Sequence, residues 1–113
     1  MTIALTACRG VTVIGLAGSI DGKTAPELQT EIAPVVQSLD KVILDLGQVD
    51  YMSSAGLRML LTLYRRFQAR KGRIALVAVA PDIQDVMSHT GFIGFFCLAG
   101  TAEAAVDMLS VAA

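Results

Sequence analysis

The sequence has few of the side chains that hold metals or carry redox chemistry. Its 113 residues include one histidine, two cysteines and no tryptophan. Cys8 and Cys97 lie far apart in apolar stretches, and neither belongs to a Cys-x-x-Cys pair. Free cysteines in such settings are typically buried as reduced thiols. The sequence therefore predicts a reducing compartment, no metal site and no cofactor.

An excess of charge of one sign is also missing. Nine Lys and Arg residues are balanced by ten Asp and Glu residues, and the formal net charge is -1. Proteins that bind nucleic acid typically carry a clearly basic face. We therefore expect no nucleic-acid partner.

Long apolar runs are absent as well. The most apolar stretch, residues 74–80, lies between Arg73 and Pro81, whereas a helix that spans a membrane needs about 20 apolar residues. The first residues lack the basic segment and apolar core of a signal peptide. We therefore expect a cytoplasmic protein that does not associate with membranes.

The sequence does contain a regular alternation of strand and helix patterns. Thr24 and Glu27 have the spacing of a capping box at the start of the first helix. Because parallel neighbouring strands need a helical crossover, the order β-β-α-β-α-β-α-β-α predicts an α/β fold with a mainly parallel mixed sheet. We expect one domain over residues 1–113 with about five strands and four helices. The strands are predicted at residues 1–7, 10–17, 42–46, 73–79 and 95–98, and the helices at residues 24–39, 55–70, 81–91 and from 101 onward.

No group of residues has the pattern of a catalytic centre, so we expect no catalytic residues and a protein that is not an enzyme. His89 falls in the last turn of a predicted helix, where the helix dipole explains it better than catalysis does. Asp45 and Asp50 are either cap and loop residues or contacts to a partner. The basic residues between 65 and 73 predict a solvated face, with a docking patch for an acidic partner as the alternative.

The most informative segment is VILDLGQVDYMSSAGLRMLL, residues 42–61. A buried strand is followed by a short loop that leads through Ser53 and Ser54 into the predicted helix. One serine hydroxyl caps a helix by accepting a hydrogen bond from a free backbone N–H group, but two are more than one cap needs. Gly56 is a poor residue for the first turn, costing about 1 kcal/mol relative to alanine. Its best use would be to keep side-chain bulk away from a docking site.

The run DYMSSAGLR, residues 50–58, resembles the signature of the STAS domain of anti-sigma factor antagonists. The run GSID at residues 18–21 is similar to the Gly-x-Leu/Ile-Asp loop of that family, and TAP at residues 24–26 is similar to the start of its first helix. SHTGF at residues 88–92 is similar to its helix that ends at a glycine before the last strand. The resemblance covers nearly the whole chain and implies the STAS fold.

The resemblance implies a partner-switching protein. The unphosphorylated domain would bind an anti-sigma factor that is also an ATP-dependent serine kinase, and would so release the sigma factor. The kinase would phosphorylate Ser54, and a PP2C-type phosphatase would restore the hydroxyl. A phosphoryl group adds about −1.5 to −2 charge, which a helix N-terminus accommodates, so the switch would need no refolding.

The resemblance also implies the residues of the site. Asp21 matches the loop aspartate of the family, although an aspartate before Gly22 also stabilises a turn. Ser53 stands where the family commonly has aspartate, so a neighbouring negative charge is missing. We expect a monomer or a weak dimer. The phosphorylation site is predicted at Ser54, and the partner-binding residues are predicted to be Asp21, Gly22, Ser53, Ser54, Ala55, Gly56 and Arg58.

A second function from a different class is a STAS scaffold subunit of a stress-sensing or transport complex that is never phosphorylated. Such a subunit need not keep a serine at position 54, whereas this chain has one. A receiver domain phosphorylated on aspartate would need acidic residues after its first strand and a lysine after its last. Residues 1–7 contain no acid and no lysine follows Leu98, so we exclude a receiver domain.

Overall fold

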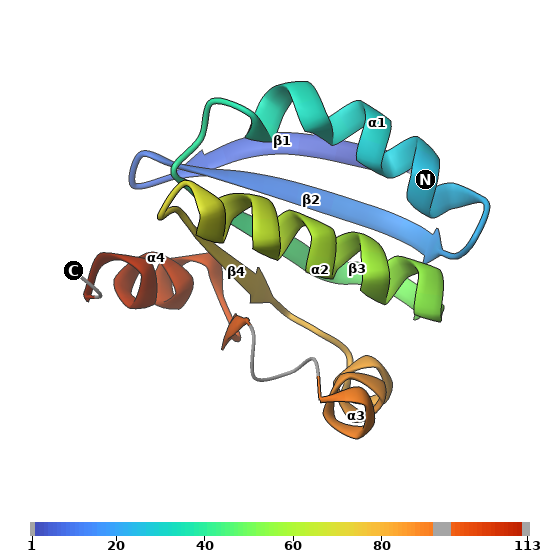
Figure 1. Ribbon diagram of the computed structural model, residues 1–113. Helices are drawn as coiled ribbons and strands as arrows, with labels where there is room; N and C mark the ends of the chain where they lie inside the picture. Colours follow the sequence, from blue (N-terminus) through green and yellow to red (C-terminus); the bar gives the residue numbers. More distant parts are fainter. Residues whose placement is uncertain (1, 92–95, 112–113) are drawn as a thin grey trace.

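The computed structural model describes residues 2–91 and 96–111, and its elements follow the predicted order (Figure 1). The α/β fold is confirmed over these residues, with one mixed sheet of five strands and with four helices. Residues 1 and 95, which the predicted first and last strands include, lie outside the described residues. The elements are β1 (Thr2–Cys8), β2 (Val11–Ile20), α1 (Thr24–Val36), β3 (Lys41–Met52), α2 (Ser54–Ala69), β4 (Arg73–Val77), α3 (Pro81–Thr90), β5 (Cys97–Ala99) and α4 (Ala102–Val111).

A tight hairpin joins β1 to β2. Arg9 and Gly10 have φ angles of 51° and 83°, and two successive positive φ angles are those of a type I′ turn. Cys8 and Val11 pair directly across this turn, and the two strands are antiparallel. The sheet order is β1-β2-β3-β4-β5, and every pair beyond the hairpin is parallel.

The main core lies between one face of the sheet and helices α1 and α2. Crossovers between parallel strands are right-handed, so the β2–α1–β3 and β3–α2–β4 crossovers place both helices on the same face (Figure 1). Ile32 of α1, Leu60 of α2 and Leu44 of β3 are fully or almost fully buried there. Burial of each such side chain contributes about 1.5–3 kcal/mol, so the apolar stripes of the two helices fix how they lie on the sheet.

A smaller core covers the opposite face of the sheet. Ala105 and Leu109 of α4 pack there with Ile43 and Ala75. The Thr101 hydroxyl accepts a hydrogen bond from the Ala104 N–H group at 3.2 Å, which confirms the predicted helix cap. Because both faces of the central strands are covered, β4 and the first half of β3 are apolar almost throughout.

β3 is longer than predicted. The sequence predicts a strand over residues 42–46, whereas β3 runs from Lys41 to Met52. Its second half pairs only with the end of β2, through two register shifts and up to the pair Ile20–Met52. Exposed polar residues such as Gln48 make this half look like a loop in the sequence. The extension carries the chain to Ser53, beyond the part of β3 that pairs with β4.

Other element ends follow from local backbone conformation. Ala78 has a φ of 56°, and this left-handed conformation ends β4 at Val77, two residues before the predicted end. Gly91 ends α3 in the left-handed conformation, as predicted. Within the described ranges, no helix is long and apolar enough to cross a membrane.

Arg70 ties the end of α2 to the end of α1. Its Nη2 group donates hydrogen bonds to the carbonyl oxygens of Val36 at 2.9 Å and Leu39 at 2.8 Å. The guanidinium also lies over the Phe67 ring, 4.7 Å from its centroid. The last carbonyls of a helix lack partners within the helix and attract cations. The sequence indicated a solvated basic face or a docking patch here, and it missed this contact because the acceptors come from a distant segment, at and just beyond the end of α1.

Replacing Arg70 with methionine should lower the free energy of unfolding by about 1–2 kcal/mol, because two charge-assisted hydrogen bonds are lost while the apolar stem is kept. The matched change Arg65→Met alters an exposed arginine of α2 and should cost less than about 0.5 kcal/mol. Urea unfolding followed by circular dichroism measures both. Equal losses in the two variants would contradict the assigned role of Arg70.

Candidate functional site

The predicted site residues gather where β2 and β3 end. The Ser53 N–H group donates a hydrogen bond to the Ile20 carbonyl at 2.8 Å, so the start of α2 is joined to the end of β2. Asp21 follows directly in the chain. The extension of β3 therefore brings the 21–23 loop and the first turn of α2 to the same end of the molecule.

The two serines at the start of α2 have different roles. Ser53 is the N-cap residue, with an extended backbone and a side-chain oxygen that accepts a hydrogen bond from the Gly56 N–H group at 3.4 Å. Ser54 is the first helical residue and is exposed. Its hydroxyl makes no hydrogen bond to any described residue. Because Ser53 already caps the helix, the hydroxyl of Ser54 is not needed to hold the fold.

Gly56 serves the interior of the protein. It is buried, and a Cβ atom at this position would lie 2.8 Å from Ile20 Cγ2, 2.8 Å from Met52 Cγ and 3.1 Å from the Ile20 carbonyl oxygen. The expectation that this glycine keeps bulk away from an outer docking site is therefore wrong in its reason. The missing side chain instead lets the first turn of α2 pack directly on the ends of β2 and β3.

Asp21 holds the loop that leads into α1. Its Oδ1 atom accepts hydrogen bonds from the N–H groups of Lys23 and Thr24, both at 2.9 Å. In return, the Thr24 hydroxyl accepts one from the Asp21 N–H group at 2.9 Å. The backbone hydrogen bonds from Thr24 and then Lys23 lower the pKa of the Asp21 carboxyl group. The turn-stabilising role of Asp21 is confirmed.

The predicted capping box at the start of α1 is wrong. The sequence pairs Thr24 with Glu27, but Thr24 makes its reciprocal bonds with Asp21, three residues earlier, and Glu27 is exposed. A threonine three residues after an aspartate and three before a glutamate fits both arrangements. The Ala25 N–H group donates to the Asp21 carbonyl at 2.8 Å, which shows that helical hydrogen bonding already begins at Asp21.

Asp45 and Asp50 form local hydrogen bonds. The Asp45 carboxylate accepts one from the Gly47 N–H group at 2.9 Å, and that of Asp50 accepts one from the Ser19 hydroxyl at 2.8 Å. The second bond joins β2 to β3 just before the site. These are the cap and loop roles that the sequence left open, while a contact of either residue with a partner stays a prediction.

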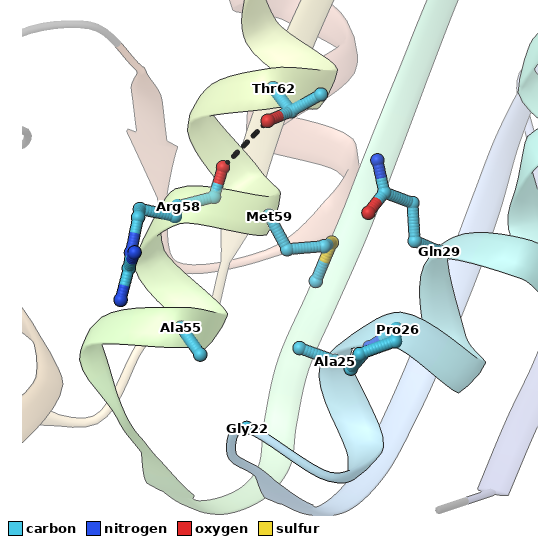
Figure 2. A pocket seen from close by; sticks show the side chains of 8 residues that line it. All are labelled: Gly22, Ala25, Pro26, Gln29, Ala55, Arg58, Met59 and Thr62. Atoms are coloured by element: carbon cyan, nitrogen blue, oxygen red, sulfur yellow. Dashed lines mark hydrogen bonds between the residues drawn. The ribbon is translucent and has the colours of Figure 1, made fainter.

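A shallow groove of about 260 Å³ runs between α1 and α2 next to the site (Figure 2). Three of the predicted partner-binding residues line it, namely Gly22, Ala55 and Arg58. None of the described residues that line it is Asp or Glu, so its lining is neutral apart from the charge of Arg58. Its remaining lining residues, which sequence reasoning missed, are Ala25, Pro26, Gln29, Met59 and Thr62.

The missed residues could have been found only with the topology in hand. Ala55, Met59 and Thr62 follow one another at helical spacing on α2. They can be recognised as one wall of a groove only when it is known that α1 lies beside them. Tyr51 was also missed, although it is 55% exposed and stands three residues before Ser54. Val49 and Met52 are buried, and Tyr51 lies between them in the sequence. Its position in this strand, just before the two serines, was a signal that could have marked it as an exposed aromatic residue of the site.

In the described ranges, no three His, Cys, Asp or Glu side chains are grouped in a way that could hold a metal ion. His89 lies in the last turn of α3, where its Nδ1 atom is 2.7 Å from the Asp85 carbonyl oxygen. This contact is local to the helix. The site therefore consists of a free hydroxyl at a helix N-terminus, a loop held by Asp21 and the neighbouring groove.

The fold and the site together define a small α/β domain that presents a serine hydroxyl beside a docking groove. The family model of the STAS domain matches residues 2–106. BtrV of Bordetella bronchiseptica, whose name assigns it to the anti-sigma factor antagonists, is 31% identical over 99% of this chain and 97% of its own. The chain therefore belongs to the STAS domain family, and the predicted STAS fold is confirmed.

Solved structures agree with this assignment. An anti-sigma factor antagonist from Mycobacterium paratuberculosis is 30% identical, with a TM-score of 0.84 over 96% of this chain and 93% of that one. SpoIIAA in its unphosphorylated form is 23% identical, with a TM-score of 0.78 and 96% of both chains covered. SpoIIAA of Bacillus in its phosphorylated form is 24% identical, with a TM-score of 0.70 over 95% of this chain and 98% of that one. The two SpoIIAA structures support the fold.

Replacing Gly56 with alanine should lower the free energy of unfolding by about 1–3 kcal/mol, because the new methyl group would overpack against Ile20 and Met52. Helix propensity alone predicts the opposite, a gain of about 1 kcal/mol. Thermal and urea unfolding measure the difference.

The control is Gly22→Ala, since a Cβ atom there would meet nothing within 4 Å. It should leave stability unchanged or raise it by up to about 1 kcal/mol. A Gly56→Ala variant as stable as Gly22→Ala would show that the close packing of α2 is not required.

Proposed function

We propose that this domain is a phosphorylation-controlled binding protein whose switch residue is Ser54. In its unphosphorylated form it binds an anti-sigma factor that is also a serine kinase, and the bound sigma factor is released. The observation that carries the proposal is the division between the serines: Ser53 caps α2, while Ser54 is exposed and its hydroxyl bonds to none of the described residues. A hydroxyl that the fold does not use is free to be modified.

The proposed partner surface combines the first turn of α2 with the groove. Ser54 precedes Ala55, and Ala55 lines the groove together with Gly22 and Arg58. Asp21 keeps its loop in place through the amides of Lys23 and Thr24. A partner that covers Ser54 therefore meets a preformed surface with few ordering costs, which favours binding.

Phosphorylation would act on binding and leave the fold intact. A negative group at the N-terminus of α2 suits the helix dipole by about 0.3–1 kcal/mol. A partner that covers Ser54 would instead have to desolvate the phosphate, and an unpaired buried charge costs several kcal/mol. Because the phosphate is tolerated in the free domain and costs energy in the complex, phosphorylation would release the partner. A PP2C-type phosphatase would remove the phosphate and restore the neutral surface.

The alternative function, a STAS scaffold subunit that is never phosphorylated, makes a different prediction for the residue at position 54. A subunit that is never modified has no need of an exposed hydroxyl at position 54, and another small residue would serve. BtrV, which is named as an anti-sigma factor antagonist, is matched over 97% of its length. Both points favour the switching function.

Ser54→Ala should abolish labelling by the partner kinase with radioactive ATP, whereas Ser53→Ala should keep most of it. Ser53→Ala loses a cap and should cost about 1 kcal/mol of stability, so the labelling is done well below its melting temperature. Mass spectrometry locates the phosphate. Labelling that persists in Ser54→Ala would place the switch elsewhere.

The Ser54→Asp variant should bind the partner kinase at least tenfold more weakly than the unphosphorylated wild type does. This factor corresponds to a loss of about 1.4 kcal/mol of binding free energy. Ser54→Ala should bind as the wild type does. Calorimetric titration measures both, and melting curves of the same samples control for folding. If Ser54→Asp bound normally while folded, charge at this position would not be the switch. A melting temperature far below that of the wild type would instead attribute the lost binding to unfolding.

A further inference from the structure

We propose that a phosphate on Ser54 is held within the same molecule by Arg58, one turn further along α2. The inference rests on the proposed modification of Ser54 and adds the residue that receives the phosphate. Arg58 would then have two alternative uses, as a lining residue of the partner groove before phosphorylation and as the counter-ion of the phosphate afterwards.

The spacing of the two residues is that of neighbours on a helix. Ser54 and Arg58 are at positions i and i+4 of α2, and such residues lie one above the other on the same side of the helix. Long side chains in helices point back toward the N-terminus. Figure 2 shows the Arg58 side chain running this way, with its guanidinium near the level of Ala55 in the first turn.

Arg58 is available for this contact. It is exposed, and its side chain forms no hydrogen bond or ion pair with any described residue. The basic residues at the far end of α2 are not equivalent, since Arg70 is already bound to the carbonyls of Val36 and Leu39. A guanidinium donates two parallel hydrogen bonds to phosphate oxygens, which a lysine cannot do.

The other charged groups on the neighbouring loop and strand are two carboxylates already held by hydrogen bonds and one exposed lysine. On the 21–23 loop, Asp21 is bound to backbone amides and Lys23 carries the opposite charge on an exposed side chain. On β3, the Asp50 carboxylate accepts from the Ser19 hydroxyl. The residue next to the phosphate, Ser53, is neutral. Arg58 is therefore the cation that the helix itself supplies to the first turn.

The pairing changes what a partner meets. In the structure Arg58 is one of the residues that line the groove between α1 and α2, and its guanidinium donates no hydrogen bond to any described residue. A phosphate that engages the guanidinium takes its donors from a partner at the moment when it adds negative charge. One modification would thus alter two parts of the docking surface without any movement of the backbone.

The experiment uses the whole chain with phosphoserine incorporated at position 54 by genetic encoding, so no kinase is needed. The second pKa of the phosphate, ordinarily about 6, is read from a phosphorus NMR titration. Because a nearby cation favours the dianion, Arg58→Gln should raise this pKa by about half a pH unit, and Arg58→Lys by less. The matched control Arg65→Gln removes the same charge about three helical turns from the phosphate and should change the pKa by less than about 0.1 unit. Asp21, Lys23 and Asp50 are present in all four proteins, so their effects cancel.

Raising the salt concentration to about 1 M should shrink the difference between the wild type and Arg58→Gln, since an exposed pair is screened. A purely structural role of Arg58 would move the melting temperature and leave the phosphate pKa unchanged. A pKa shift in Arg58→Gln no larger than that in Arg65→Gln would overturn the pairing. This outcome is separate from a failure of the proposed function, which would show as absent labelling of Ser54 by a kinase.

Discussion

The close seating of α2 on the end of β2 is the constraint on which the site depends. The Ser53 N–H group is bonded to the Ile20 carbonyl, and the first turn approaches Ile20 and Met52 so closely that position 56 has no room for a side chain. Ile20 itself is completely buried. Packing in the core therefore fixes the position and direction of the N-terminus of α2. The backbone of the surface residues in that first turn is held in place as a result.

In this first turn, the residues that hold the fold and the residues proposed to act in regulation are different ones. Ser53 and Gly56 hold the turn in place, whereas Ser54 and Arg58 point to solvent. A change of charge at Ser54 is thus felt by whatever docks, while the hydrogen bonds and apolar contacts that maintain the fold are not involved. Asp21 does for the neighbouring loop what Ser53 does for the helix, since both use side-chain oxygens to hold backbone amides.

The sequence predicted the fold well because its signals are local. Apolar stripes at helical spacing and short apolar runs define the elements, and the turn at Arg9-Gly10 and the stop at Gly91 are each coded within a few residues. The second half of β3 was missed because a strand with one neighbour and exposed polar residues has no apolar pattern. The reason for Gly56, the partners of Arg70 and the groove between α1 and α2 all depend on segments far apart in the chain. No periodicity within one segment contains that information, and the direction of the Thr24 cap shows that even a local motif can fit two partners.

Exposed residues form the surface of this turn, and buried residues hold its fold. This separation has a consequence for how such domains diversify. Tyr51 and Arg58 are exposed, so other side chains at these two positions should leave the packing of Ile20, Met52 and Gly56 undisturbed. Duplicated copies of the gene would therefore be free to acquire separate partners by a handful of surface changes. Cross-talk between parallel pathways in one cell would be prevented by those few positions, while every copy kept the same framework.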